Sequence, residues 1–336
     1  MDISRLSQVL ADQPKFRYTQ INKALFQDFI ASWAEASNLP KVLRDKLTEV
    51  CPLEIRAEVF QTRGREASSK ALITLADGEI IETVLIRQKE GRNTVCVSTQ
   101  AGCPLHCAFC ATGQGGFRRN LTAEEIVEQA VFWSRYLKQE GKGAKIDNIV
   151  FMGMGEPFLN YEQFIKAVKF LNNPETMNIG ARRLSVSTAG ITEGIKRLAG
   201  EKLQINLAIS LHAPTDELRR ELMPVAKKYS LRELFKAVDN YILKTGRRVM
   251  FEYLLIKGVN DRDEDAKALA ALMQQPLYLV NLIPYNPTGR FQASERERIA
   301  EFKRILEEQK VAVTVRLSFG AEIGAACGQL RGKGKR

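Results

Sequence analysis

Histidine is scarce in this chain of 336 residues, which contains only His106 and His212. Chemistry that depends on several histidine ligands, such as a histidine-rich metal centre, is therefore nearly excluded. The sequence also lacks any run of 18 apolar residues, and its first residues, MDISRLSQVL, lack the apolar core of a secretion signal. These absences predict a cytoplasmic protein with no membrane partner.

Cysteine is also infrequent, and its distribution is uneven. Three of the six cysteines, Cys103, Cys107 and Cys110, fall within eight residues. Disulfide partners are usually spread along a chain, so this clustering predicts a reducing compartment and a role other than cross-linking. The cluster therefore points to chemistry at these thiols.

Positive charge exceeds negative charge. The chain has 50 Lys and Arg against 39 Asp and Glu, which gives a formal net charge of +11 and a pI of about 9.4. With 45% hydrophobic and 26% charged residues, the composition excludes disordered and fibrous classes. The length allows about two domains, or one large fold with an appendage. The basic surplus favours an anionic partner, with nucleic acid first, over a merely soluble basic surface.

Between residue 91 and about residue 318, apolar segments of strand length alternate with amphipathic helical stretches. This alternation is typical of repeated βα units, which build a parallel sheet. The expected strands cover residues 94–98, 146–152, 182–188, 203–211, 248–255, 277–283 and 311–317. The first expected helix opens with a capping box formed by Thr122 and Glu125.

The pattern within these strands predicts a barrel. Residues 203–211 alternate strictly between apolar and polar or small side chains, and residues 311–317 do the same. Strands covered by helices on both faces would be apolar throughout. One apolar face and one polar face therefore predict an α/β barrel with an open, ligand-holding lumen. The same alternation points Cys96 into the lumen.

The chain divides into three predicted parts. Residues 1–90 differ from the rest, with a helical stretch over 20–50 and an Asp-Gly pair at 77–78 that is a strong signal for a type I′ hairpin. They are expected to form a small N-terminal α+β domain. Residues 91–318 are expected to form the barrel, and residues 319–336, rich in Gly and Ala with a basic end, a flexible C-terminal tail.

The three clustered cysteines have the spacing C-x3-C-x2-C. They follow the first barrel strand, at the loop end where barrels place their active sites. A four-iron cluster normally takes four thiolates, so three leave one iron open for a substrate. The alternative is a zinc site completed by His106 or by a remote cysteine.

This spacing, with Phe109 at the aromatic position, resembles that of the radical S-adenosylmethionine (SAM) enzymes. The resemblance implies a partial (β/α) barrel, a [4Fe-4S] cluster on the three cysteines, and SAM chelated by the open iron. The segment MGMGEP resembles the GGEP-type motif of that superfamily, which implies that Gly155 and Glu156 hold the SAM amino group. Further candidate SAM contacts, for which ordinary polar lining or a turn is the alternative, are Ser187, Ser210, Leu211, His212 and Asn286.

A closer resemblance, over about residues 15–330, is to the bacterial dual-specificity rRNA and tRNA adenine-C2 methyltransferases. The segments concerned are CVSTQAGCPLHCAFCATGQGGFRRNL, VFMGMGEPFLN, LSVSTAG, LAISLHAP, NLIPYNP and AACGQL. The resemblance implies two SAM molecules per turnover, one to methylate Cys327 and one to start a radical step on that methyl group. Cys96 would then release the product by forming a transient disulfide with Cys327, and Glu82 would accept the C2 proton. Glu82 lies one residue farther from Cys96 than in the family pattern.

The implied function is methylation at C2 of an adenosine in the peptidyl-transferase region of 23S rRNA and of the adenosine 3′ to the anticodon in tRNAs. A one-electron donor such as flavodoxin, a disulfide reductant and a monomeric state are also expected, and residues 1–90 would help to grip RNA. Two alternatives stay open. One is the related adenine-C8 rRNA methyltransferase that confers antibiotic resistance, and the more remote one is a non-enzymatic RNA-binding protein with a structural metal.

Overall fold

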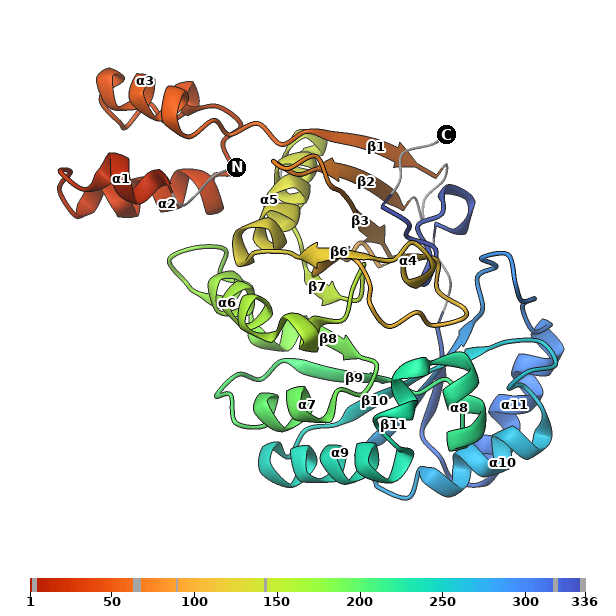
Figure 1. Cartoon of the computed structure of the whole chain (residues 1–336). Helices are drawn as coiled ribbons and strands as arrows, with labels where there is room; N and C mark the ends of the chain where they lie inside the picture. The colour runs from red at the N-terminus through yellow and green to blue at the C-terminus, as the bar shows by residue number, and fades with distance from the viewer. Residues whose placement is uncertain (2–4, 63–67, 89, 142–143, 317–319, 333–336) are drawn as a thin grey trace.

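An open ten-stranded sheet forms the body of the protein (Figure 1). The computed structural model describes residues 1, 5–62, 68–88, 90–141, 144–316 and 320–332. The strand order is β1-β2-β3-β4-β7-β8-β9-β10-β11-β12. Strands β4 to β12 of this sheet run parallel, whereas β1, β2 and β3 pair antiparallel and extend the sheet beyond β4. The parallel part is the partial barrel expected from the sequence.

Each parallel strand overlaps one of the strands predicted from the apolar alternation. Leu317, at the end of the last predicted strand, lies outside the described residues. The strands of the large sheet are β1 (Ala57–Gln61), β2 (Ser69–Thr74), β3 (Ile80–Arg87), β4 (Asn93–Cys96), β7 (Asn148–Phe151), β8 (Leu184–Thr188), β9 (Asn206–Ser210), β10 (Val249–Leu255), β11 (Tyr278–Pro284) and β12 (Val313–Val315).

Helices between successive parallel strands cover the outer face of the barrel (Figure 1). They are α5 (Ala123–Glu140), α6 (Tyr161–Asn172), α7 (Thr192–Leu198), α9 (Leu231–Thr245), α10 (Asp263–Leu272) and α11 (Arg296–Glu308), while the shorter α4 (Ala111–Gln114) and α8 (Asp216–Leu222) lie near the cysteine loop. Helix α5 begins at the predicted capping box, in which Thr122 and Glu125 each bind the main-chain N–H of the other. Among the described helices, none is both long and apolar enough to cross a membrane.

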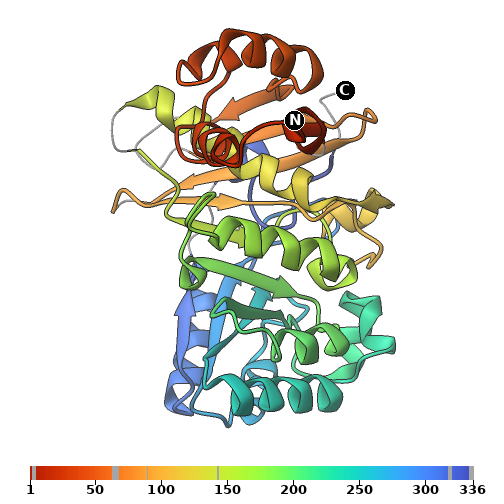
Figure 2. The ribbon, with the colours of Figure 1, turned by 90° about the vertical axis from the view of Figure 1, so that its left-hand side faces the viewer.

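The N-terminal helical part is a group of short helices at one end of the molecule (Figure 2). The predicted helical stretch over 20–50 is wrong in its continuity. Phe29 adopts a left-handed φ of 50°, and Pro40 caps the start of the last helix, so the chain turns twice within the stretch. The group consists of α1 (Leu6–Leu10), α2 (Phe16–Phe26), the 3-10 helix η2 (Trp33–Glu35) and α3 (Lys41–Val50).

The β2–β3 hairpin forms where the sequence predicts it, but with another turn. The Gly78 N–H donates to the Leu75 oxygen at 3.0 Å, and the Leu75 N–H donates to the Glu79 oxygen at 2.8 Å. Gly78 has a φ of 88°, whereas Asp77 is not left-handed. A type I′ turn needs positive φ at both central residues, so the predicted type is wrong and the loop has three residues.

The predicted domain boundary near residue 90 falls between β3 and β4. These strands pair with Val84 opposite Cys96 and Arg87 opposite Asn93. The sheet is therefore continuous from the N-terminal strands into the barrel, and the division into separate domains stays a prediction.

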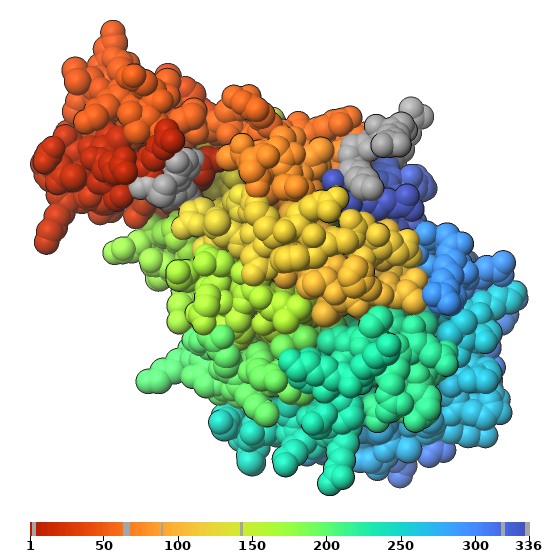
Figure 3. Space-filling view, viewed as in Figure 1, coloured from red at the N-terminus to blue at the C-terminus, as the bar shows by residue number. Residues whose placement is uncertain are grey.

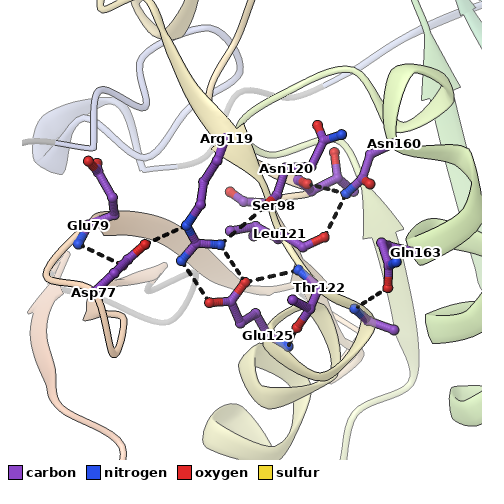
Figure 4. Close-up of polar contacts among 12 residues, drawn as sticks. Asp77, Glu79, Ser98, Arg119, Asn120, Leu121, Thr122, Glu125, Asn160 and Gln163 are labelled. Carbon is purple, nitrogen blue, oxygen red and sulfur yellow. Dashed lines mark hydrogen bonds and ion pairs between the residues drawn. The ribbon is translucent and has the colours of Figure 1, made fainter.

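A two-stranded ribbon, β5 (Gln100–Gly102) and β6 (Phe117–Asn120), flanks the cysteine loop and is fixed by Arg119 (Figure 4). The Arg119 guanidinium donates to both oxygens of the Glu125 carboxylate at 2.8 Å and to Asp77 in the hairpin. Hydrogen bonds with these two carboxylates raise the pKa of Arg119, and the bond from Arg119 lowers the pKa of Asp77. Arg119 therefore ties the ribbon both to α5 and to the hairpin.

Replacing Arg119 by alanine is expected to lower the free energy of unfolding by about 1 kcal/mol, because both of its ion pairs are partly exposed. Chemical denaturation measures this difference. Arg118→Ala is the matched control, since Arg118 is the exposed neighbour on the same strand. Equal stability of the two variants would refute the role of Arg119 in holding the ribbon.

Candidate active site

The cysteine loop lies between β5 and β6, beyond the carboxyl end of β4. The Cys103 N–H donates to the Gly116 oxygen at 3.0 Å. Gly102 has a φ of 78°, and a Cβ there would lie 1.9 Å from the Gly116 oxygen, so this close approach requires glycine. The Ala108 N–H donates to the Leu222 oxygen at 2.9 Å. The loop is therefore fixed at its ends by the ribbon and at its middle by α8.

One cavity gathers most of the predicted site residues. Leu211, which is fully buried in the core, and Glu82 do not line it. The predicted residues that line the cavity are Cys96, Cys103, Cys107, Cys110, Gly155, Glu156, Ser187, Ser210, His212, Asn286 and Cys327. The fold therefore brings residues from the cysteine loop, five barrel strands or their ends, and the C-terminal segment to one place.

The three loop thiols are the candidate ligands of an iron–sulfur cluster. A zinc ion needs its ligands around one point, whereas a four-iron cluster spreads them over separate irons. Among the described residues, no group of three or more His, Cys, Asp or Glu side chains could hold one metal ion. The His106 ring is engaged within the loop, with Nδ1 3.0 Å from the Gly113 oxygen. Cys103, Cys107 and Cys110 line one cavity together, which fits a cluster with one iron left open.

Burial controls the protonation of two of the three loop thiols. It raises the pKa of Cys103 to about 12 and that of Cys107 well above the usual range. Cys103 and Cys107 are therefore neutral thiols, and binding of iron would release their protons.

The turn after β7 brings a buried carboxyl group to the cavity wall. The Glu156 carboxylate accepts hydrogen bonds from the Phe158 N–H at 3.0 Å and the Ala189 N–H at 2.7 Å. Burial nevertheless raises the pKa of Glu156 to about 7. Gly155 has a φ of 99°, and a Cβ there would lie 2.5 Å from the Gln100 side chain. This glycine therefore allows β5 and the turn to approach closely.

Polar side chains at the ends of β8 and β9 also face the cavity. The Ser187 and Ser210 hydroxyl oxygens lie 3.1 Å apart. His212 accepts a hydrogen bond at Nδ1 from the Leu254 N–H at 3.1 Å. Burial and the nearby Arg219 charge lower the pKa of His212 to about 3. The imidazole is therefore neutral, with its proton on Nε2 as a hydrogen-bond donor.

The C-terminal segment 320–332, here called the tail, packs over the cavity and beside the N-terminal strands (Figure 3). The Gly328 oxygen accepts from the Ala111 N–H, and the Leu330 oxygen accepts from the Thr112 hydroxyl, both at 2.7 Å. These bonds join the tail to α4, directly after the cysteine loop. Residues 317–319 and 333–336, which belong to the predicted barrel end and flexible tail, lie outside the described residues.

Glu82 lies behind the tail. Its Oε1 accepts from the N–H groups of Arg331 at 3.1 Å and Gly332 at 3.0 Å. The Lys70 ammonium lies 3.3 Å from its Oε2 and also donates to the Gly324 oxygen at 3.3 Å. Glu82 is only 1% exposed. The predicted base is therefore engaged by the tail and by one lysine.

Two cysteines outside the loop share the cavity with a half-buried cation. Cys96 and Cys327 line it together with Glu252 and Arg316. Burial raises the pKa of Cys96 to about 12, and the Arg316 charge opposes this shift. Cys327, followed by Glu252, raises the pKa of Arg316. The Asn286 amide donates to the Cys327 oxygen at 3.5 Å and helps to hold the tail here.

Sequence reasoning did not select Glu252, Arg316 or Arg219 as site residues. Glu252 and Arg316 stand at lumen-facing positions of apolar strands, and a charge at such a position is a signal that could have found them. Arg219 gave no such signal, because its contacts with Ala189 and Ser210 join residues far apart in the sequence.

A model of the radical SAM superfamily matches residues 97–270, which include the cysteine loop and the strands from β7 to β10. The chain is therefore a radical SAM enzyme.

Relatives that match over nearly their full length identify the family within this superfamily. A probable dual-specificity RNA methyltransferase RlmN from Symbiobacterium thermophilum is 46% identical over 342 aligned residues, covering 100% of this chain and 91% of the relative. A relative of the same description from Chloroflexus aurantiacus is 46% identical, covering 99% and 92%. The crystal structure of a radical SAM methyltransferase from Sphaerobacter thermophilus has a TM-score of 0.92 at 43% identity, covering 99% and 98%. The chain belongs to the RlmN family, so it is a SAM-dependent RNA methyltransferase that uses a [4Fe-4S] cluster.

Proposed function

We propose that this enzyme methylates C2 of an adenosine in the peptidyl-transferase region of 23S rRNA and of the adenosine 3′ to the anticodon in tRNAs. The shared cavity is the main support, because Cys96 and Cys327 line it together with the three-cysteine loop. The relatives are described as dual-specificity RNA methyltransferases, which supports more than one RNA substrate. The net charge of +11 supports binding to phosphates.

The position of the target carbon explains why the enzyme would need a methyl-accepting cysteine in addition to the three cluster cysteines. Adenine C2 lies between two ring nitrogens and is electron-poor, so it does not attack the methyl group of SAM directly. When bound, the cluster supplies one electron for radical chemistry with SAM. Cys327 first takes a methyl group from one SAM by displacement and holds it as a thioether. The radical step consumes a second SAM, which makes two per turnover.

Three side chains complete the proposed turnover. The radical formed from the second SAM would remove a hydrogen atom from the S-methyl group, and the resulting carbon radical would bond to adenine C2 while still attached to Cys327. Glu82 then takes the C2 proton. The Cys96 thiol then loses its proton and its sulfur attacks the sulfur of Cys327, which breaks the carbon–sulfur bond and leaves a disulfide for a reductant to open. The released carbon takes up a proton, and the unpaired electron would return to the bound cluster, which gives the methylated RNA. Because Arg331 and Gly332 bind the Glu82 carboxylate, these bonds have to open before Glu82 reaches the substrate.

The proposal also covers the oligomeric state, the compartment, the electron donor and the RNA contacts. It includes a monomeric enzyme of the cytoplasm, a one-electron donor such as flavodoxin, and RNA contacts by residues 1–90. Phe16 and Tyr18 on α2 are 55% and 39% exposed, which supports these contacts because RNA-binding surfaces use aromatic side chains for stacking.

Anaerobic turnover with methyl-labelled SAM, a reductant and unmodified rRNA or tRNA tests the proposal. Nucleoside analysis is expected to find 2-methyladenosine in both RNAs. Finding 8-methyladenosine instead would show that the enzyme is an adenine-C8 methyltransferase of the antibiotic-resistance type. Finding no methylated product from enzyme with an intact cluster would refute both the C2 and the C8 function.

SAM binding is expected to weaken as the pH falls below about 7. We propose that the ionised carboxylate of Glu156 holds the SAM amino group, and the pKa of Glu156 in the folded protein is about 7. Below that pH the carboxyl group is neutral, so affinity falls by up to about tenfold per pH unit. His212, with a pKa of about 3, does not titrate in this window.

Calorimetric titration of the cluster-loaded protein with SAM, between about pH 5.5 and 8, measures this dependence. Glu156→Gln is the control, because an amide does not titrate and its weaker affinity should not change with pH. A flat profile for the unaltered enzyme would contradict the assigned role.

A further inference from the structure

Arg219 is a buried cation for which the proposed turnover has no use. It lies in α8, and its side chain is fully buried. The guanidinium donates to the main-chain oxygens of Ala189 at 2.7 Å, Leu211 at 3.3 Å, and Ser210 and Tyr229 at 3.4 Å. Among the described residues, these hydrogen-bond partners are all neutral carbonyl groups. Four bonds to carbonyls orient the side chain but leave its charge uncompensated.

A buried charge without an opposite charge beside it is unfavourable. Burial accordingly lowers the pKa of Arg219 to about 10, and the largest opposing effect comes from Cys107, followed by Asp216. The Asp216 carboxylate is engaged elsewhere, since it accepts from the Leu231 N–H at 2.8 Å. The group best placed to balance Arg219 is therefore Cys107, whose neighbour Ala108 is hydrogen-bonded to the end of α8, once iron binding has removed the proton of its thiol.

The packing of α8 explains this proximity. Leu222, at the end of the helix, is bonded to the middle of the loop through Ala108 and packs in one buried cluster with Phe109. On the other side, Ala189 accepts from Arg219 through its oxygen and donates through its N–H to Glu156. Arg219 thus lies behind the cavity wall, between the cysteine loop and the turn after β7.

We infer that Arg219 is a positioning residue that raises the reduction potential of the cluster by keeping a fixed, buried positive charge beside Cys107. Reduction adds one electron, so the reduced cluster is more negative than the oxidised cluster by one charge. A cation in a low-dielectric environment stabilises the more negative state. The electron comes from the one-electron donor, no bond forms or breaks, and Arg219 keeps its proton throughout.

A role in electron transfer gives a function to the energetically unfavourable buried charge of Arg219. Radical chemistry begins with electron transfer to the cluster, and a higher potential makes that transfer more favourable. The neutral His212 nearby cannot supply the same effect, because its pKa of about 3 keeps it uncharged. The Arg219 guanidinium donates to Ala189 after β8 and to Ser210 at the end of β9. Among the described residues, it is the one guanidinium that bonds to the ends of both strands.

Redox titration of the full-length protein, reconstituted anaerobically with iron and sulfide, tests the inference. Electron paramagnetic resonance of the reduced cluster gives the midpoint potential. Arg219→Gln keeps hydrogen-bond donors but removes the charge, so its midpoint potential should be more negative. Arg219→Lys keeps the charge but loses the planar set of donors, so its potential should match the unaltered protein while its melting temperature falls.

Arg220→Gln is the matched control, because Arg220 is the next residue on α8, is partly exposed and pairs with Glu217. Its potential should not change. An unchanged potential in cluster-loaded Arg219→Gln would overturn the inference. If Arg219→Gln does not fold, the Arg219→Lys variant provides the test. A midpoint potential equal to that of the unaltered protein, with reduced stability, supports the inference. A more negative midpoint potential overturns it. The measurement needs no RNA, so it is independent of the proposed substrate.

Discussion

Replacing Cys327 by alanine is expected to abolish methylation of RNA. Alanine has no sulfur to accept the methyl group, so no thioether can form at this position. Anaerobic assays with methyl-labelled SAM should find no label in RNA and none bound to the protein. Reductive cleavage of SAM should continue, because the three loop cysteines are intact.

The matched control for this prediction is Cys51→Ala. Cys51 is buried at the end of α3 and does not line the cavity. Its variant should methylate RNA at close to the normal rate. Methylation by the Cys327 variant, at any rate near that of the control, would rule out the thioether route.

Replacing Cys96 by alanine is expected to trap the enzyme on its substrate. The RNA would be joined through the methyl carbon to Cys327, and no second sulfur would be available to break the carbon–sulfur bond. A labelled RNA should therefore migrate with the protein on a denaturing gel after a single turnover. Digestion with nuclease should leave one modified nucleoside on the tail peptide.

The double variant Cys96→Ala, Cys327→Ala separates this adduct from tight binding. It should bind RNA but form no species that survives denaturation. Normal multiple turnover by the single Cys96 variant would show that another group resolves the intermediate.

The parts of the site that the sequence predicted are those encoded by local patterns. The cysteine loop is contiguous, so its spacing alone indicates a cluster. The strands alternate with a period of two, which distinguishes the helix-covered face from the lumen and points Cys96 inward. All of these features depend on residues within about ten positions of one another.

The parts that the sequence did not predict depend on contacts between distant segments. The bonds from Arg331 and Gly332 to Glu82 span 249 and 250 residues. The guanidinium of Arg219 joins three loops, which no periodicity reveals. Even the hairpin turn differed from prediction, because an Asp-Gly pair fits both a two-residue and a three-residue loop and the strand register selects between them.

The antiparallel pairing of β3 with β4 also determines where residues can be inserted without changing the separation of Glu82 and Cys96. Val84 lies opposite Cys96, and the turn beyond the strands is closed by a hydrogen bond from the Gln88 N–H to the Arg92 oxygen at 3.0 Å. Sheet register, not the number of intervening residues, therefore sets the separation of Glu82 from Cys96. A residue inserted between these strands leaves their register unchanged, so this end of the hairpin is a suitable place for attaching a probe.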